Sequence, residues 1–246
     1  MKQNCINNYR FWLSLVAILL VRFSLFPQNS SDGIIISTID STKKIDGCSD
    51  LLVNGPLYFQ ANRQANGSPY LFNEEFEDGV VYTGETEFKN SSLNYDISVQ
   101  ELLLLITTSN DSRVVISLSD ALIDSFMFSK YLFVNPVKIG LTSDFTYLHK
   151  INNGKFTMYI GYQKDFINRF NNTNPYGKYG SSKRSIVITD NQKINNISSK
   201  KTLLRLFPSI SKDLLIFLRK NKIKLRKASS DQLAYLMEFI NDRYEN

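Results

Sequence analysis

Hydrophobic and polar positions alternate along much of residues 56–197, in short runs separated by clusters of Asn, Gly, Ser and Asp. In the clearest run, at residues 93–99, Leu, Tyr, Ile and Val alternate with Asn, Asp and Ser. A period of two places one face of a β-strand on a core and the other in water. Residues 102–106 continue this run and are apolar on both faces, as a central strand would be. The pattern predicts a mainly antiparallel, β-rich region.

Two pairs of apolar runs are spaced as β-hairpins. Residues 145–151 and 155–160 flank an Asn-Asn-Gly sequence, and Asn-Gly supplies the positive φ angles of a tight turn. A second hairpin is predicted over residues 186–197. The polar stretch at 168–182, rich in Asn, Gly and Tyr, is expected to be an exposed loop. Further strands are expected at residues 56–59, 68–72, 79–83, 114–118, 121–128 and 131–134.

After Ser198 the apolar residues recur with a helical period. One apolar run ends before Pro208, and a second recurs at helical spacing over residues 210–218, with Ser211 as its expected cap. Ser229 and Gln232 form a capping box. The apolar face that follows this box consists of Leu233, Leu236, Met237, Ile240 and Tyr244. We therefore expect three short helices, each burying a single stripe.

Together these patterns predict an α+β fold: a mainly antiparallel β-sandwich or open barrel followed by three short C-terminal helices. We expect a single domain over residues 56–246, β-rich at 56–197 and helical at 199–245. The helices must bury their apolar stripes on the sheet or on one another, so an independent helical domain is not expected.

The N-terminus has the pattern of a secretory signal peptide. Lys2 and Arg10 precede an apolar run at residues 11–21, which matches the roughly 7–15 residues of an exported h-region. A membrane span needs about 20 apolar residues. We expect residues 1–27 to be a signal peptide and 28–55 a linker or N-terminal extension. The alternatives are an uncleaved anchor and a buried N-terminal helix.

Composition excludes several classes of protein. The 246 residues are 43% hydrophobic and 21% charged, which argues against wholesale disorder. Two cysteines cannot form a disulfide scaffold or a four-thiolate zinc site, and one histidine excludes a centre with several imidazoles. The chain contains neither a Gly-rich phosphate loop nor a Gly-x-Ser-x-Gly elbow. We expect no cofactor, no bound metal and no enzymatic activity.

The candidate reactive residues have structural explanations. His149, the single histidine, is expected to be a solvent-facing strand residue, and Cys48 has aspartates nearby that do not favour a thiolate. The densest carboxylate cluster is at residues 74–78, and Asp120 and Asp124 lie four residues apart. Paired carboxylates can hydrolyse glycosides when they lie about 5–10 Å apart. A secreted, carboxylate-dependent hydrolase therefore remains the alternative function.

Charge is concentrated in one segment. The chain has a formal net charge of +6, yet residues 200–227 contain ten Lys or Arg and one acidic residue, Asp213. An exported chain meets anionic lipids or glycans, so nucleic acid is not expected as a partner. The candidate anion-binding surface consists of Arg219, Lys220, Lys222 and Lys224. The alternative is that these charges only solvate a helix face.

Several short motifs resemble one family. They are the segment Ala-Asn-Gly-Ser-Pro-Tyr-Leu at 65–71, Glu-Phe at 75–76, Gly-Val-Val at 79–81, Leu-Asn-Tyr-Asp at 93–96, Asn-Gly-Lys at 153–155, and a helical tail from Lys-Lys-Thr-Leu-Leu at 200–204 to Tyr235. Across roughly residues 56–244 the chain resembles exported α+β proteins of Bacteroidota-type bacteria that have no assigned function. The resemblance implies a signal peptide but transfers no catalytic residue. The chain departs from the family at 242–244, where Asp-Arg-Tyr replaces a Tyr-Tyr-Asn-like ending.

These observations favour an exported, non-enzymatic binding or interaction module of the bacterial envelope. We expect it in the periplasm, at the outer-membrane surface or outside the cell, with no transmembrane span in the mature chain. The expected partner is an envelope protein or an anionic glycan or lipid surface. A basic adaptor that docks on anionic envelope components is the second alternative, beside the hydrolase.

Overall fold

The structure, a computed structural model, describes residues 52, 54–108, 110–190 and 193–245. All the described residues belong to one compact unit. The predicted signal peptide, most of the predicted linker at 28–55, and Cys48 lie outside the described residues.

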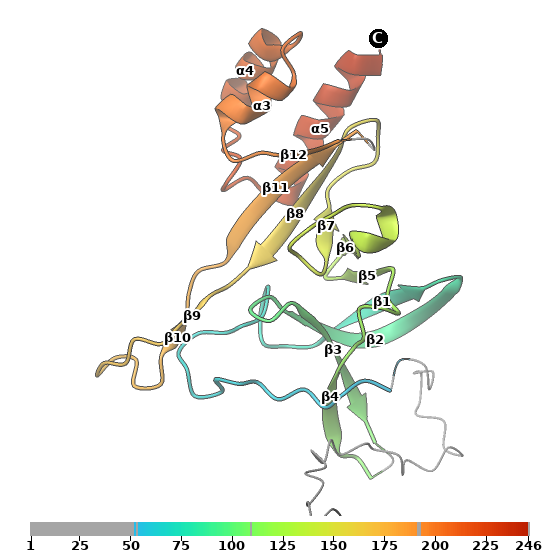
Figure 1. The fold of residues 1–246 in the computed structure, drawn as a ribbon, viewed down its shortest axis with the longest axis vertical. Helices are drawn as coiled ribbons and strands as arrows, with labels where there is room; N and C mark the ends of the chain where they lie inside the picture. Colours follow the sequence, from blue (N-terminus) through green and yellow to red (C-terminus); the bar gives the residue numbers. More distant parts are fainter. Residues whose placement is uncertain (1–51, 53, 109, 191–192, 246) are drawn as a thin grey trace, which may run out of the picture. The chain divides into compact units, whose positions relative to one another are not determined.

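Most of the described strands form one large sheet (Figure 1). Its order is β12-β11-β8-β7-β6-β5-β1-β2-β3-β4, with every neighbouring pair antiparallel, and it does not close on itself. The predicted α+β fold, a mainly antiparallel β-sandwich or open barrel followed by three C-terminal helices, is therefore confirmed. The strands are β1 Glu77–Thr83, β2 Thr86–Asp96, β3 Glu101–Thr107, β4 Arg113–Ser117, β5 Ser125–Phe128, β6 Tyr131–Val134, β7 Leu148–Lys150, β8 Thr157–Gln163, β11 Lys183–Thr189 and β12 Ile194–Asn196. Two short strands, β9 Phe166–Ile167 and β10 Lys178–Tyr179, pair separately.

The three predicted helices are present as α3 Lys200–Leu206, α4 Ser211–Lys220 and α5 Ser230–Glu245, and a short 3₁₀ helix, η2, spans Val137–Ile139. The capping box before α5 is confirmed: Gln232 N donates to Ser229 Oγ, and Ser229 N donates to Gln232 Oε1. The expected Ser211 cap is wrong. Ser211 is already the first residue of α4, and Ile210 at the N-cap position forms no side-chain cap.

The β2–β3 connection corrects the strand prediction at residues 93–106. The alternating run does not continue past Asp96, because the chain turns and Asp96 pairs with Glu101 across the hairpin. The Asp96 carboxylate forms this turn: Oδ1 accepts hydrogen bonds from Ser98 N at 2.7 Å and Val99 N at 3.3 Å. An aspartate that bonds to the backbone two residues later competes with the extended conformation.

Several other predicted strands have different bounds. The segments at 56–59 and 68–72 contribute only isolated bridges, Leu57 to Ile116 and Tyr70 to Asp96. The first of these lies along β4, where Tyr58 N donates to Val115 O. The strand expected at 121–128 starts only at Ser125, and the predicted loop at 168–182 contains β10.

The β7–β8 hairpin is confirmed, but its turn is wider than the predicted Asn-Gly turn. Ladder pairing extends to Lys150 and Tyr159, and Ile151 N donates to Met158 O. Gly154 has φ 148°, which is outside the range of a tight Asn-Gly turn. The loop is instead held by α5, where the Asn241 side chain bonds both Phe156 N and Phe156 O.

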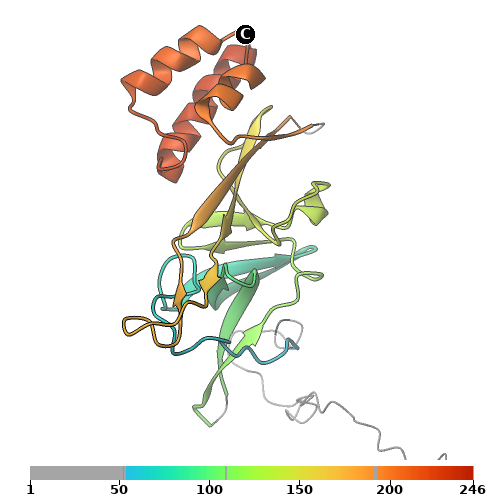
Figure 2. The same cartoon turned by 60° about the vertical axis from the view of Figure 1, so that its left-hand side comes forward.

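Two main hydrophobic clusters lie along the sheet. In the first, which involves β1 to β6, the rings of Phe126 and Phe133 stack at 4.8 Å and Tyr95 packs edge-on against both. In the second, the inward side chains of β8 and β11 pack against all three helices, which lie together at that end of the sheet (Figures 1 and 2). The helices therefore pack on the sheet, which is one of the two arrangements expected from the sequence.

Candidate anion-binding site

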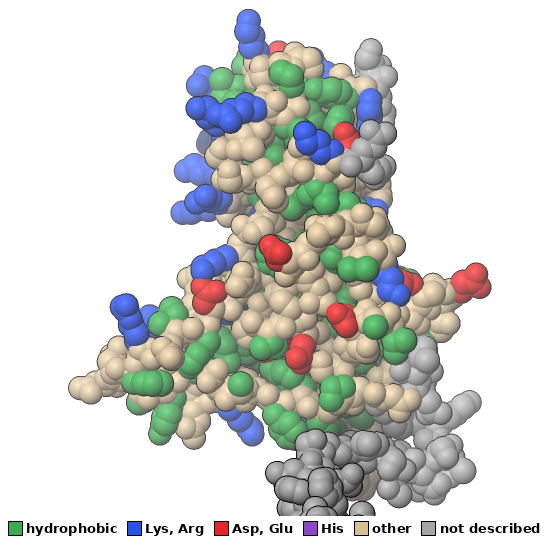
Figure 3. Space-filling model, in the orientation of Figure 1, with side chains coloured by type: hydrophobic (Ala, Val, Ile, Leu, Met, Phe, Trp, Pro, Cys, Tyr) green, Lys and Arg blue, Asp and Glu red, His purple; other side chains and the backbone are tan. Residues whose placement is uncertain are grey.

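The basic residues of the segment 200–227 are all exposed. Arg219 and Lys220 occupy the last turn of α4, where cations also stabilise the negative end of the helix dipole. Lys222 and Lys224 follow in the connection to α5. Figure 3 shows Lys and Arg side chains gathered along one side of the helical region. We name the ten side chains the cationic surface: Lys200, Lys201, Arg205, Lys212, Arg219, Lys220, Lys222, Lys224, Arg226 and Lys227.

The charges of the cationic surface are not neutralised by salt bridges within the described residues. Asp213, the one acidic residue of the segment, pairs instead with Arg243 from α5 at 3.0 Å. Arg226 donates a single hydrogen bond, of 3.4 Å, to the backbone oxygen of Ser198. The positive charge of this surface therefore remains available to a partner.

Exposed apolar side chains accompany these cations. Ile216 on α4 is 62% exposed, although isoleucine is among the residues most often buried. Lys212 lies four residues before Ile216, and Arg219 and Lys220 lie three and four residues after it. Residues three or four apart are neighbours on a helix, so all four side chains share one face. Tyr235 of α5 is also exposed, and its ring lies 5.0 Å from that of Phe217.

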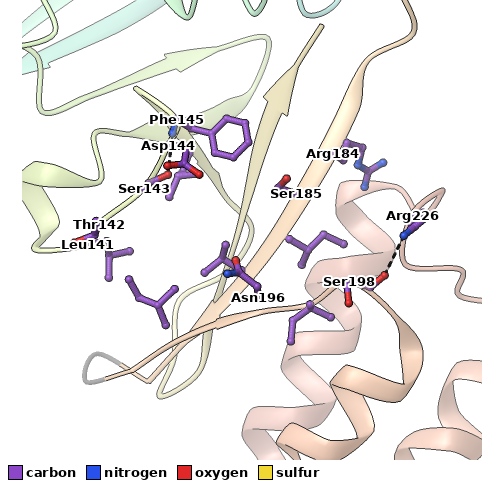
Figure 4. A pocket seen from close by; sticks show the side chains of 15 residues that line it. Leu141, Thr142, Ser143, Asp144, Phe145, Arg184, Ser185, Asn196, Ser198 and Arg226 are labelled. Carbon is purple, nitrogen blue, oxygen red and sulfur yellow. Dashed lines mark hydrogen bonds between the residues drawn. The ribbon is translucent and has the colours of Figure 1, made fainter. Parts of the chain in front are cut away.

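A cavity of about 530 Å³ opens beside this surface. It lies beside the end of β12, where the β12 ladder covers only Val187–Thr189 of β11 and Ile197 N donates to Ile186 O. Figure 4 shows Ser143, Asp144 and Phe145 at one side of the cavity and Arg184, Ser198 and Arg226 at the other. Its volume is within the range of small-ligand pockets.

Two guanidinium groups and one exposed carboxylate, that of Asp144, line this cavity, so its charged groups carry a net positive charge. Arg184 donates from Nη2 to Ala228 O at 2.9 Å, which ties β11 to the connection before α5, while its buried Nε has no hydrogen-bond partner in the described part of the chain. Arg226, a member of the cationic surface, lines the same cavity. Hydroxyls of Ser143, Ser185 and Ser198 add further donors. Charged donors with hydroxyls suit a phosphate or carboxylate group.

The sequence reasoning missed Arg184. In the β11–β8 ladder it is paired with Tyr162, two and four residues from the inward-facing Ile186 and Ile188. An arginine in register with buried isoleucines is a pattern that could have indicated this site, but the strand was predicted to begin only at residue 186. Arg226 lines the cavity, and none of the four residues predicted as the anion-binding surface does.

Among the predicted carboxylate candidates, Asp124 has contacts that fix its position. Glu74 and Glu75 are exposed on the segment before β1. Asp124 forms a salt bridge with Lys138 at 3.4 Å and accepts a hydrogen bond from Gly84 N, which ties β5 to the β1–β2 turn. Asp120 is exposed. These contacts explain Asp124 without catalysis.

His149 is buried, and the expectation of a solvent-facing residue is wrong. Its Nδ1 lies 3.0 Å from the Tyr162 hydroxyl, and the rings of Tyr131 and Phe133 lie against it. Burial first, and the nearby positive charge of Arg184 second, lower the pKa of His149 to about 4. The imidazole is therefore neutral near pH 7.

Neither a metal site nor a membrane-spanning helix is found among the described residues, and the chain matches no known protein in three comparisons. Among the described residues, no group of three or more His, Cys, Asp or Glu side chains could hold a metal ion. None of the described helices is both long and apolar enough to span a membrane. The chain matches no protein-family model, no curated protein and no solved structure. The resemblance to exported Bacteroidota-type proteins therefore stays a prediction.

Proposed function

We propose that the protein is an exported, non-enzymatic binding module of the bacterial envelope that docks on anionic lipid surfaces through its helical region. The observation that carries this proposal is the face of α4, where exposed Ile216 is surrounded by Lys212, Arg219 and Lys220. Helices that lie at the interface of an anionic bilayer combine apolar side chains with Lys and Arg, and this face of α4 has both. A polar glycan would not require the exposed isoleucine.

Electrostatics supports the same partner. Each Lys or Arg close to an anionic membrane contributes about 1 kcal/mol to binding. The cationic surface has no salt bridges within the described residues, so binding need not first break one. The cavity with Arg184 and Arg226 adjoins this surface and can accept one anionic group.

The test compares vesicles of phosphatidylglycerol with vesicles of phosphatidylcholine in a flotation assay. Replacing Arg219, Lys220, Lys222 and Lys224 by Gln should lower the preference for phosphatidylglycerol by about 10²–10³-fold, since four cations are lost. Binding of the unaltered protein should also weaken as salt is added. The apolar N-terminal run is identical in all variants and can bind both types of vesicle. The relevant measurement is therefore the ratio of binding to phosphatidylglycerol vesicles over binding to phosphatidylcholine vesicles.

A charge-matched control separates the site from net charge. Replacing the exposed Lys89, Lys155, Lys178 and Lys193 by Gln removes the same charge elsewhere and should change the preference by less than about tenfold. Equal losses in the two variants would show that net charge alone acts. Binding to alginate, an acidic polysaccharide, without any preference for anionic vesicles would contradict the lipid proposal.

Export is checked by mass spectrometry of the N-terminus in fractionated cells.

A further inference from the structure

A second cavity, of about 400 Å³, lies at the β2–β3 turn, on residues that the proposed function does not use. Aromatic side chains from three separate segments line it: Tyr58 and Phe59 from the strand-like segment along β4, Phe166 from β9, and Tyr179 from β10. Asp96 and Glu101, which are paired across the β2–β3 hairpin, provide two carboxylates. No Lys or Arg is among the residues that line this cavity.

The two carboxylates differ in what surrounds them. Asp96 is 2% exposed and fully engaged, because Oδ2 accepts from the Tyr58 hydroxyl at 2.6 Å and Oδ1 accepts from the turn backbone. Lys164, held by two backbone oxygens, adds a nearby positive charge that offsets Asp96. Glu101 is half-buried, and its carboxylate has neither a hydrogen bond nor a salt bridge within the described residues. Glu101 therefore provides the uncompensated negative charge.

The aromatic rings are held in place but remain accessible. Phe166 and Tyr179 pack edge-on at 5.5 Å. Gly177, with φ 79°, leaves room for the Phe166 ring, because a Cβ at this position would lie 2.6 Å from it. Phe59 is 78% exposed, the highest exposure among the large hydrophobic side chains of the described residues. The Phe59 ring is therefore accessible to a ligand that enters the cavity.

We infer that this cavity binds an organic cation, such as a quaternary or primary ammonium group, between the rings of Phe59, Phe166 and Tyr179 and the carboxylate of Glu101. Aromatic faces attract cations through the ring quadrupole, and aromatic cages are used to bind choline-like groups. A carboxylate without a protein counter-ion adds a direct charge partner. An anionic ligand would be repelled by the same lining.

The charge requirement can be tested with an isosteric pair of ligands. In NMR titrations of the purified protein, choline should bind with a Kd of about 0.1–10 mM. Its neutral isostere 3,3-dimethylbutan-1-ol should bind at least about tenfold more weakly, because it has the same shape without the charge. Equal binding of the two ligands, or no choline binding up to about 100 mM, would overturn the inference. Binding of N-acetylglucosamine without binding of choline would assign the cavity to neutral sugars instead.

Matched variants then locate the binding. Glu101→Gln and Phe59→Ala should each weaken choline binding about tenfold. Two controls should stay within about twofold: Glu85→Gln, an exposed carboxylate at the β1–β2 turn, and Phe170→Ala, which removes a phenylalanine that is 67% exposed in a different loop. Losses of equal size in the controls would overturn the site. The variant in which Arg219, Lys220, Lys222 and Lys224 are replaced by Gln should bind choline as the unaltered protein does. Failure of the lipid proposal can therefore be distinguished from failure of the organic-cation proposal.

Discussion

At the scale of single residues, His149 connects the two halves of the sheet. It lies on β7, in register with Phe133 of β6 and Ile160 of β8, and its ring nitrogen meets the Tyr162 hydroxyl. Its ring also lines a small cavity with Lys130, Lys150 and Asp231. Burial and Arg184 hold the pKa of His149 at about 4, so the folded protein keeps a neutral imidazole where an unfolded chain would be protonated.

This pKa predicts a loss of stability in mild acid. Between about pH 6.5 and pH 4 the unfolded chain binds a proton at His149 and the folded chain does not, so the free energy of unfolding falls as the pH falls. The loss attributable to His149 should approach about 3 kcal/mol at pH 4. Urea denaturation at pH 7 and pH 4.5 measures it. His149→Gln can keep a hydrogen bond to Tyr162 but does not titrate, so it should show a smaller pH dependence than the unaltered protein. Identical pH dependence in the two proteins would rule out this role for His149.

At the scale of elements, the alternation of residues predicted the strands more reliably than it predicted where each strand ends. The hairpins and helices were found from patterns that the structure confirms. The turn after β2 was missed because Asp96 occupies a polar position of the alternating run, and its bonding to the turn backbone cannot be read from alternation. The wide β7–β8 loop was missed because its fixing partner, Asn241, lies 85 residues from Phe156.

The dependence of the β7–β8 loop on α5 can be tested at Asn241. This buried side chain accepts from Phe156 N at 2.8 Å and donates to Phe156 O at 3.0 Å. Asn241→Leu keeps a similar volume but removes the partner of Phe156 N, whereas Phe156 O still accepts from Asn152 Nδ2 at 2.8 Å. The substitution should therefore lower the free energy of unfolding by about 1–3 kcal/mol. Asn172→Leu, in an exposed loop, should change it by less than about 0.5 kcal/mol. An Asn241→Leu protein as stable as this control would show that the contact is dispensable.

At the scale of the whole described unit, the cationic surface could be predicted from the sequence and the cavities could not. The ten cations are close together in the chain, so their joint exposure on the helical region follows from local spacing. The cavity at Arg184 joins β11, β12, residues 141–145 and the connection before α5, and the cavity at Glu101 joins segments from residue 56 to residue 179. Such convergence depends on strand order, which alternation of hydrophobic residues does not specify.

The shared core of helices and sheet predicts that they unfold together. Leu236 of α5 is fully buried in the cluster that also contains Ile160 of β8 and Ile188 of β11. Leu236→Ala should cost about 2–5 kcal/mol through lost packing and the cavity that it leaves. Far-UV circular dichroism reports mainly the helices, and tyrosine fluorescence reports mainly the β-rich region, which holds ten tyrosines against two in α5. Both signals should then shift to the same lower denaturant midpoint. Ile216→Ala, at an exposed site on α4, should leave both midpoints nearly unchanged. If only the helical signal shifted in Leu236→Ala, the helices would be an independently folding unit, and the interface with β8 and β11 would not stabilise the sheet.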